Sequence, residues 1–254
     1  MTEKTVRKRG RRKNPEAPSL DRATIVLAAL AQIDEEGLEG FSLRSLATRL
    51  GVYPTAVYWY VQSRNELLAQ VVGLILDKIQ MQRNRRTWQS YIRDLFANFR
   101  SAIRAHPNVA PLIGTQLVSN THGHPLFVEQ LLSALSRGGL TGTELVGAYN
   151  SVIAAMVGFV TQEFASVPTD NPMEWQLAVQ QRLLEIDRKQ FPTLAENLPA
   201  LSNHAFILRW QNGVESPLDA SFSIFVDIVV AGIEALIAQS SEANAGPNVE
   251  RVAT

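Results

Sequence analysis

Three adjacent aromatic residues, Tyr58, Trp59 and Tyr60, lie between Thr55 and Arg64 in one short segment of the chain. Hydroxyl and guanidinium groups donate hydrogen bonds to anionic oxygens, and aromatic rings add apolar contact surface. A short helix buries only one side, so some of these rings must face outward. The combination predicts a surface that contacts a large partner carrying phosphate groups.

The segment that carries these residues, 41–64, has the signals of two short helices joined by a tight turn. Ser42 suits the N-cap of the first helix, because its hydroxyl can accept a bond from a free backbone N–H. Gly51 follows where a helix ends in a left-handed conformation, and Pro54 can begin the second helix. The pattern predicts a helix-turn-helix, and the alternative is a helical hairpin that packs on its own domain.

The segment resembles the helix-turn-helix of the TetR (tetracycline-repressor) family of bacterial transcription regulators. The matching residues stand at fixed spacing without an internal gap: Glu39, Gly40, Phe41, Ser42, Arg44, Leu46, Ala47, Leu50, Gly51, Val52, Tyr58, Trp59, Val61, Leu67 and Leu68. The resemblance implies an all-α protein with an N-terminal three-helix helix-turn-helix DNA-binding domain. A C-terminal helical ligand-binding and dimerisation domain would follow it.

In such proteins the second helix of the helix-turn-helix enters the major groove of double-stranded operator DNA. The resemblance places Pro54, Thr55 and Ala56 at the base-reading positions. Arg44 has two interpretations, a bidentate contact to guanine or a surface arginine paired with Glu39 or a phosphate. The expected DNA-binding residues are Ser42, Arg44, Pro54, Thr55, Ala56, Tyr58, Trp59, Tyr60, Arg64, Arg9 and Arg11.

The net charge of zero hides an uneven distribution along the chain. Residues 1–19 contain seven bases and two acids, so they carry +5 and the rest of the chain carries −5. With almost nothing apolar, this segment cannot form a core and is expected to be disordered alone. We expect a basic arm that neutralises phosphates, with Arg9 and Arg11 in the minor groove; the alternative is a solubilising tail.

Apolar residues recur at helical spacing along the rest of the chain, which predicts helices throughout and no strands. Helices are expected over residues 21–36, 63–83, 87–106, 125–137, 143–164, 173–190 and 219–238, with shorter ones at 108–113 and 203–210. Gly114 is expected to end the helix at 108–113, and 191–201 is a proline-punctuated stretch. The predicted domains are the arm 1–19, a DNA-binding domain 20–84, a ligand-binding and dimerisation domain 85–240 and a polar tail 241–254.

The composition excludes several classes of protein. A chain of 254 residues with 46% hydrophobic content can bury a core, and the absence of cysteine excludes disulfides and thiolate metal sites. The most apolar run, 222–238, contains Asp227 and Glu234, which are costly in a bilayer. No apolar segment follows the basic start, so we expect no secretory signal, no membrane contact and a cytoplasmic location.

The last helix, with the long one at 143–164, is expected to form a homodimer interface. The helix is apolar on nearly all sides and therefore needs cover on several of them, and small residues let a partner approach closely. The helix also resembles the final helix of the tetracycline-repressor subgroup, in which these helices form a four-helix dimer interface. The alternative is an internal core helix. The expected interface residues are Ala154, Gly158, Phe222, Phe225, Val229, Gly232 and Leu236.

A C-terminal domain of this size exceeds what dimerisation needs, which indicates a pocket for a small-molecule effector. The expected ligand-binding residues are Phe96, Phe99, His106, Leu112, Gln116, Leu131, Asn150, Met156, Phe159, Gln162 and Trp175. Each aromatic residue among them has an alternative role as ordinary core.

The effector is not expected to be magnesium–tetracycline. By resemblance, Gln80 and Leu95 replace the histidine and asparagine that grip the drug, and Leu112 or Ile113 replaces the metal-binding histidine. A more apolar molecule is expected instead, with no cofactor. His122 and His124 flank a glycine, but no further ligand is spaced to complete a zinc site, so no metal is expected.

Together these features predict a homodimeric repressor that binds a palindromic operator and is released by its effector. A ligand-independent DNA-binding or architectural protein is the alternative, and a filled C-terminal core would favour it. The sequence lacks a Ser-His-Asp, paired-carboxylate or glycine-rich phosphate pattern, which argues against an enzyme.

Overall fold

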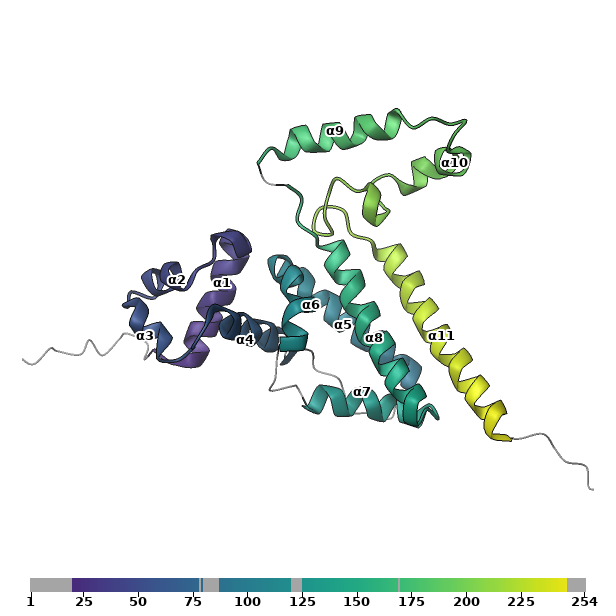
Figure 1. Cartoon of the computed structure of the whole chain (residues 1–254), viewed down its shortest axis with the longest axis horizontal. Helices are drawn as coiled ribbons and strands as arrows, with labels where there is room; N and C mark the ends of the chain where they lie inside the picture. Colours follow the sequence, from purple (N-terminus) through teal and green to yellow (C-terminus); the bar gives the residue numbers. More distant parts are fainter. Residues whose placement is uncertain (1–19, 78, 80–86, 120–124, 169, 246–254) are drawn as a thin grey trace, which may run out of the picture.

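The described part of the chain is predominantly helical and contains no strand, which confirms the all-α prediction (Figure 1). The computed structural model describes residues 20–77, 79, 87–119, 125–168 and 170–245. Its helices are α1 (Arg22–Gly40), α2 (Leu43–Arg49), α3 (Pro54–Tyr58), α4 (Arg64–Asp77), α5 (Trp88–Ala105), η1 (Pro107–Val109), α6 (Ala110–Ser119), α7 (Pro125–Arg137), α8 (Gly142–Glu163), α9 (Pro172–Leu184), α10 (Pro192–Leu201), η2 (Phe206–Leu208) and α11 (Asp219–Ala245). The expected arm 1–19 lies outside the described residues.

Helices α1–α4 form the N-terminal domain, and the predicted start and turn signals of α2 and α3 are in place, whereas α4 ends at Asp77 rather than at residue 83. The Ser42 hydroxyl accepts from the backbone N–H of Ser45, which confirms the N-cap of α2. Gly51 has a φ of 67°, which a residue with a side chain adopts only at a cost, and Pro54 begins α3. The backbone of α1 is interrupted at Gly37, where the first helix was predicted to end.

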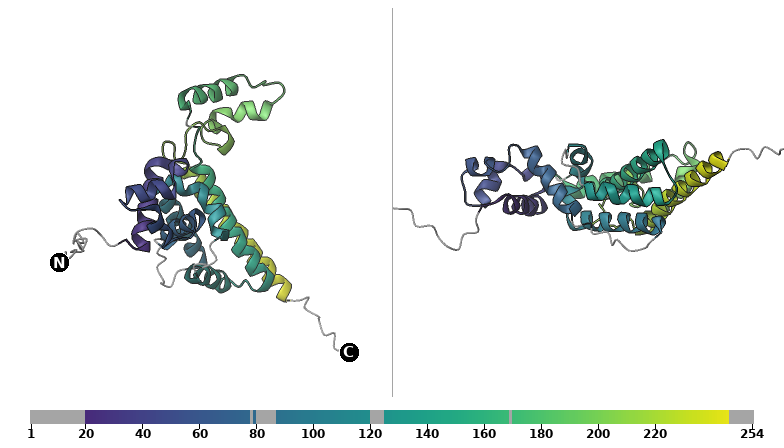
Figure 2. Two further views of the ribbon diagram at one scale, coloured as in Figure 1. Left: turned by 60° about the vertical axis from the view of Figure 1, so that its left-hand side comes forward. Right: turned by 90° about the horizontal axis from the view of Figure 1, so that it is seen from below.

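Helices α5–α8 and α11 form the main part of the C-terminal domain, with α8 and α11 running side by side as its two longest helices (Figure 1). Helices α9 and α10 project from the end of this bundle (Figure 2). Every residue of α9 and α10 is at least partly exposed to solvent.

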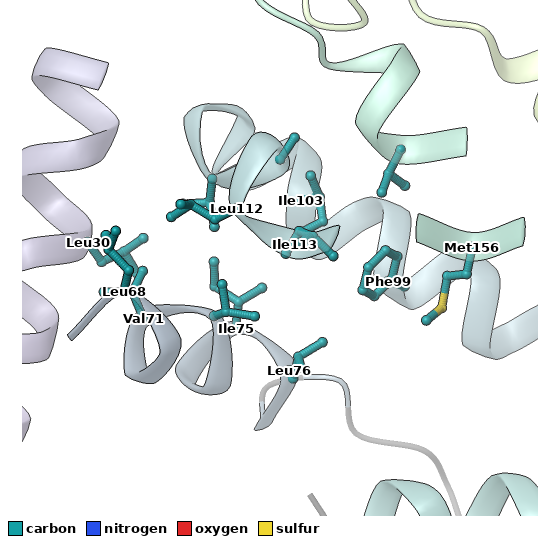
Figure 3. Close-up of a cluster of buried hydrophobic side chains, with 14 of the residues drawn as sticks. Leu30, Leu68, Val71, Ile75, Leu76, Phe99, Ile103, Leu112, Ile113 and Met156 are labelled. Carbon is teal, nitrogen blue, oxygen red and sulfur yellow. The ribbon is translucent and has the colours of Figure 1, made fainter. Parts of the chain in front are cut away.

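One hydrophobic core runs from the N-terminal domain into the C-terminal domain (Figure 3). Leu30 and Leu68 belong to the first domain, Leu112 extends the cluster into α6, and Phe99 and Met156 carry it to α5 and α8. All five side chains are buried. Because the core continues from one domain into the other, a shift of α6 or α5 displaces side chains that pack directly against α1 and α4.

Several predicted boundaries in the C-terminal domain are wrong. Helix α6 continues through Gly114, where a Cβ would only touch Val157, so a glycine in a packed helix was mistaken for its end. Helix α9 ends at Leu184 rather than 190, because the Asp187 carboxylate accepts from the next backbone N–H groups and forms a turn. Helix α11 extends to Ala245.

The segment between α9 and α11 was also misread. The proline-punctuated stretch forms helix α10, with Pro192 in the first turn and Pro199 inside. The short helix predicted at 203–210 is only the 3-10 turn η2, because Asn203 adopts a φ of 59° and its carboxamide oxygen accepts from the N–H of Trp210 and Gln211. The segment thus folds back toward the start of α11.

Candidate nucleic-acid interface and apolar cavity

Helix α3 presents aromatic side chains on its outer side. Val57 is fully buried and faces the domain, whereas Trp59 is 88% and Tyr58 52% exposed. Tyr53, immediately before the helix, is 79% exposed and was missed from sequence. Tyr60 is exposed to a smaller degree. The rings form a surface in which three tyrosine hydroxyls and an indole N–H are available as hydrogen-bond donors.

The segment that follows α3 is held by charged side chains from α1 and α4. The guanidinium group of Arg22 donates to the Tyr60 carbonyl at 3.1 and 2.6 Å and to the Glu66 carboxylate at 2.7 Å. Glu66 also accepts from the N–H of Gln62 at 2.7 Å. Arg22 was not singled out from sequence, because nothing local in the pattern links it to a helix nearly forty residues away.

Helix α2 is fixed to α1 by two polar contacts. Arg49 donates to both carboxylate oxygens of Glu35, at 2.5 and 2.6 Å, and this bond lowers the pKa of Glu35. The Gln32 amide donates to the Ser45 hydroxyl at 2.8 Å. The helix-turn-helix and α1 therefore move as one unit.

The structure places the other predicted DNA-binding residues as follows. Arg44, Pro54 and Thr55 are exposed, and Ala56 is half-buried. Arg64 donates to the Leu38 carbonyl at 3.2 Å and lies over the Phe41 ring at 5.6 Å, so its guanidinium is already engaged within the domain. Arg9 and Arg11 lie outside the described residues. Their contacts with DNA, like those of the rest of the set, stay predictions.

A cavity of about 700 Å³ lies between α8, the α10–η2 segment and the start of α11. The ring of Phe159 is stacked on Phe225 at 4.9 Å between ring centres and meets Phe206 edge-on at 5.3 Å. The cavity is lined by Ala154, Ala155, Gly158, Phe159, Gln162, Ala200, Leu201, His204, Ala205, Phe206, Leu218, Ser221 and Phe225. Its walls are apolar except for an amide, an imidazole and a hydroxyl.

Of the predicted ligand-binding residues, only Phe159 and Gln162 line this cavity. Five others are buried in the continuous core: Phe96, Phe99, Leu112, Leu131 and Met156. Gln116 is buried, and its side-chain oxygen has no hydrogen-bond partner among the described residues. Asn150 is exposed on α8, Trp175 is half-buried on α9, and His106 bonds to Asp34 in the N-terminal domain. Sequence reasoning missed the cavity wall from α10 and η2, whose residues had been treated as a connection.

A cluster of charged side chains around the buried Glu163 lies beside the cavity. Glu163 is fully buried, and its carboxylate accepts from Arg100 at 2.7 and 2.5 Å and from the N–H of Leu218 at 3.0 Å. Arg100 also pairs with Asp219 at 2.8 Å, which Arg104 contacts at 2.9 Å. These two arginines lower the pKa of Asp219, with the Arg104 hydrogen bond the larger cause.

The cluster anchors the segment before α11. The backbone carbonyl of Glu163 accepts from the N–H of Gly213 at 2.7 Å, and a Cβ on Gly213 would lie only 2.4 Å from the Glu163 side chain. Arg209 contacts the same carbonyl at 3.4 Å, and burial lowers its pKa despite the neighbouring Glu163 carboxylate. The chain between η2 and α11 is thereby tied to the end of α8.

The predicted interface residues fall on two different sides of their helices. Phe222, Phe225, Val229 and Leu236 pack against the protomer's own core, whereas Ala154, Gly158 and Gly232 are exposed. The outer side of α11 instead carries Ile224, 60% exposed, and Ile228, 65% exposed. Both α8 and α11 are long and apolar enough to span a membrane by length and composition, with 28% and 17% of their most apolar windows buried.

Two family models match the chain. Residues 25–71 match the model of bacterial regulatory proteins of the tetR family, and residues 82–237 match the tetracyclin repressor-like C-terminal domain. A helix-turn-helix with an outward aromatic helix, carried on a helical C-terminal domain, defines a bacterial transcriptional regulator. The chain belongs to the TetR family, with the C-terminal domain of the tetracycline-repressor type.

Curated relatives agree with this assignment. A helix-turn-helix-type transcriptional regulator of Saccharopolyspora erythraea is 26% identical over 185 residues, covering 72% of this chain and 77% of the relative. The class G tetracycline repressor protein of Vibrio anguillarum is 24% identical over 221 residues, covering 85% of this chain and 95% of the relative.

Solved structures show the same fold. Apo ActR of Streptomyces coelicolor superposes with a TM-score of 0.70 at 19% identity, covering 88% of this chain and 99% of ActR. ActR in complex with actinorhodin gives a TM-score of 0.67 at 22% identity, covering 86% of this chain and 98% of ActR. BioQ bound to its double-stranded DNA operator gives a TM-score of 0.54 at 25% identity, covering 64% of this chain and 95% of BioQ.

Proposed function

We propose that the chain is a homodimeric, cytoplasmic repressor that binds a palindromic operator through α3 and is released by an aromatic, largely apolar small molecule. The observation that carries the DNA-binding part is the outward set of tyrosine and tryptophan rings on a rigidly held α3. Their hydroxyl and N–H groups suit phosphate contacts, and their rings suit thymine methyl groups and sugars. BioQ, which shares the fold, is known in a complex with its operator.

The dimer part of the proposal rests on the outer sides of α8 and α11. Apolar helices this long and this exposed in a DNA-binding regulator call for a protein partner, because a large apolar patch in water is costly. Exposed small residues outside the cavity wall, Gly147 on α8 and Gly232 on α11, would let the partner's helices approach closely. A two-fold pairing also supplies two copies of α3, as a palindromic site requires.

The ligand part rests on the cavity beside Phe159. Three aromatic rings and few polar groups suit a flat, mainly apolar molecule held by one or two hydrogen bonds from Gln162, His204 or Ser221. ActR, which shares the fold, binds actinorhodin. A cavity of about 700 Å³ favours this function over a ligand-independent DNA-binding protein, for which a filled C-terminal domain was expected.

Selection of duplexes from a random pool tests the proposal. The wild-type protein should enrich a palindrome whose half-sites lie about one turn of DNA, or a multiple of it, apart. Sedimentation of the complex should give two chains per duplex. Enrichment of sequences without two-fold symmetry, or one chain per site, would contradict the homodimeric repressor.

A further inference from the structure

We infer that the second half of α5 transmits the state of the cavity to the DNA-binding domain, with Arg100 and Arg104 at one end of this route and His106 and Asn108 at the other. This inference rests on the proposed ligand response and identifies the residues that would couple it to DNA. None of these four side chains lines the cavity or belongs to the helix-turn-helix, so they act as positioning residues.

The cavity end of the route consists of two contacts. Leu218 lines the cavity, and its backbone N–H donates to the buried Glu163 carboxylate that holds Arg100. Phe159 lines the cavity as well and packs edge-on against Phe222 at 5.2 Å. The guanidinium group of Arg100 lies over that same Phe222 ring, 4.4 Å from its centre. A ligand that displaces Leu218 or Phe159 therefore acts on Arg100.

The other end of the route is a polar seam between the domains. The imidazole Nδ1 of His106, directly after α5, lies 2.8 Å from the Asp34 carboxylate of α1. The Asn108 amide donates to the backbone carbonyls of Ile33 and Asp34, both at 3.0 Å. The side chains of His106 and Asn108, which directly follow α5, thus bond to a carboxylate and to two backbone carbonyls of α1.

The seam lies beside the contacts that hold α2. Asp34 is the neighbour of Glu35, whose carboxylate pairs with Arg49 at the end of α2. An α-helix is stiff over the two turns that separate Arg100 from His106, so displacement of the first is passed to the second. Coupling of this kind is a free energy shared by ligand binding and DNA binding. It can be measured as the effect of DNA on ligand affinity or of the ligand on DNA affinity.

The test measures the affinity of the fluorescent probe 1-anilinonaphthalene-8-sulfonate, an aromatic and mostly apolar anion, for free protein and for protein saturated with the selected palindromic duplex. The ratio of the two dissociation constants is the coupling factor. The Ala200→Trp protein, in which the cavity is filled, supplies the signal of probe bound elsewhere. For the wild-type protein we expect a factor of about five or more, as is typical of allosteric regulators.

Asp219→Asn weakens the cavity end of the route, and Asn108→Ala removes the two hydrogen bonds that the Asn108 amide donates to α1 at the other end. Each variant should bring the coupling factor to within about twofold of one, while probe binding without DNA and duplex binding without probe change less than about twofold. Asp227→Asn is the matched control, because it breaks another ion pair between α11 and α5, with Arg93, farther from the cavity. It should keep the wild-type factor.

A wild-type coupling factor in either Asp219→Asn or Asn108→Ala would overturn the inference and leave the proposed function standing. Equal probe affinity in free and duplex-bound wild-type protein has a different meaning. It would overturn the ligand response itself, and the inference with it.

Discussion

The molecule exposes two apolar surfaces of different chemistry. The exposed apolar groups around α3 are rings that end in a hydroxyl or an N–H, whereas those on α8 and α11 are mainly isoleucine, valine, alanine and glycine, which have no polar ends. Rings with polar ends can lie against a hydrated, charged polymer and still satisfy their donors. Aliphatic side chains gain only from close packing against another apolar surface. The chemical group at the end of an exposed apolar side chain therefore indicates which kind of partner it contacts.

The largest effect is expected at the aliphatic surface. Ile228→Glu places a charge in the proposed dimer interface and should weaken dimerisation by about 3–4 kcal/mol, the scale of a strong interface residue. Operator affinity should fall with it, because one chain then binds one half-site. Sedimentation velocity measures the first effect and fluorescence anisotropy the second. Leu126→Glu, at another exposed aliphatic position, is the control, and unchanged sedimentation of Ile228→Glu would separate this surface from dimerisation.

A smaller effect is expected at the aromatic surface. Trp59→Ala should weaken operator binding by about 1–2 kcal/mol per half-site, in the range of a single base or sugar contact, without changing the oligomeric state. Trp175→Ala on α9 removes the same side chain far from α3 and should bind the operator normally. If the two substitutions weakened binding equally, Trp59 would not be a DNA contact.

Filling the cavity between α8, the α10–η2 segment and the start of α11 should have a still smaller effect. A ligand at ten times its dissociation constant stabilises the wild-type protein by about 1.4 kcal/mol. Ala200→Trp should remove this gain in a thermal-shift assay while leaving dimer and operator binding intact. Ala195→Trp, on the same helix but outside the cavity wall, should keep it. A full thermal shift in Ala200→Trp would place the ligand elsewhere.

Tyr91 is buried, unlike the tyrosines around α3, and at neutral pH the smallest effect is expected there, because its ring is un-ionised in the folded and the unfolded chain. Its hydroxyl has no hydrogen-bond partner, and burial raises its pKa to about 12. The unfolded chain ionises near pH 10, so folding stability should decline as the pH rises from about 10 to 12. Tyr91→Phe should flatten this part of a urea-unfolding profile, whereas Tyr53→Phe, at an exposed ring, should not. An identical decline in both variants would assign it to other groups.

The DNA-binding domain could be predicted well because its signals are local. Ser42, Gly51 and Pro54 each fix a backbone conformation through their own chemistry, and the structure has each where it was expected. The cavity could not be predicted in the same way. Its wall comes from α8, α10, η2 and α11. Because Pro199 lies inside α10, that segment was predicted to be a connection rather than a helix.

The two sides of α11 illustrate a second limit. In a helix that is apolar on all sides, the sequence has no hydrophobic periodicity to indicate which side packs against the protomer's own core. The larger Phe222 and Phe225 were assigned to the interface, yet they pack within the protomer, and Ile224 and Ile228 face outward. Arg100 and Glu163 are likewise separated by 63 residues, and no local pattern pairs them.

The core that continues from Leu30 through Leu112 to Met156 has a consequence for protein engineering. Two domains with separate cores can be exchanged between proteins at a linker, and each melts on its own. Here the N-terminal domain completes its core with residues of α6, so the chain should unfold in a single calorimetric transition. A chimaera that grafts a foreign DNA-binding domain onto this protein would have to bring matching α6 residues with it.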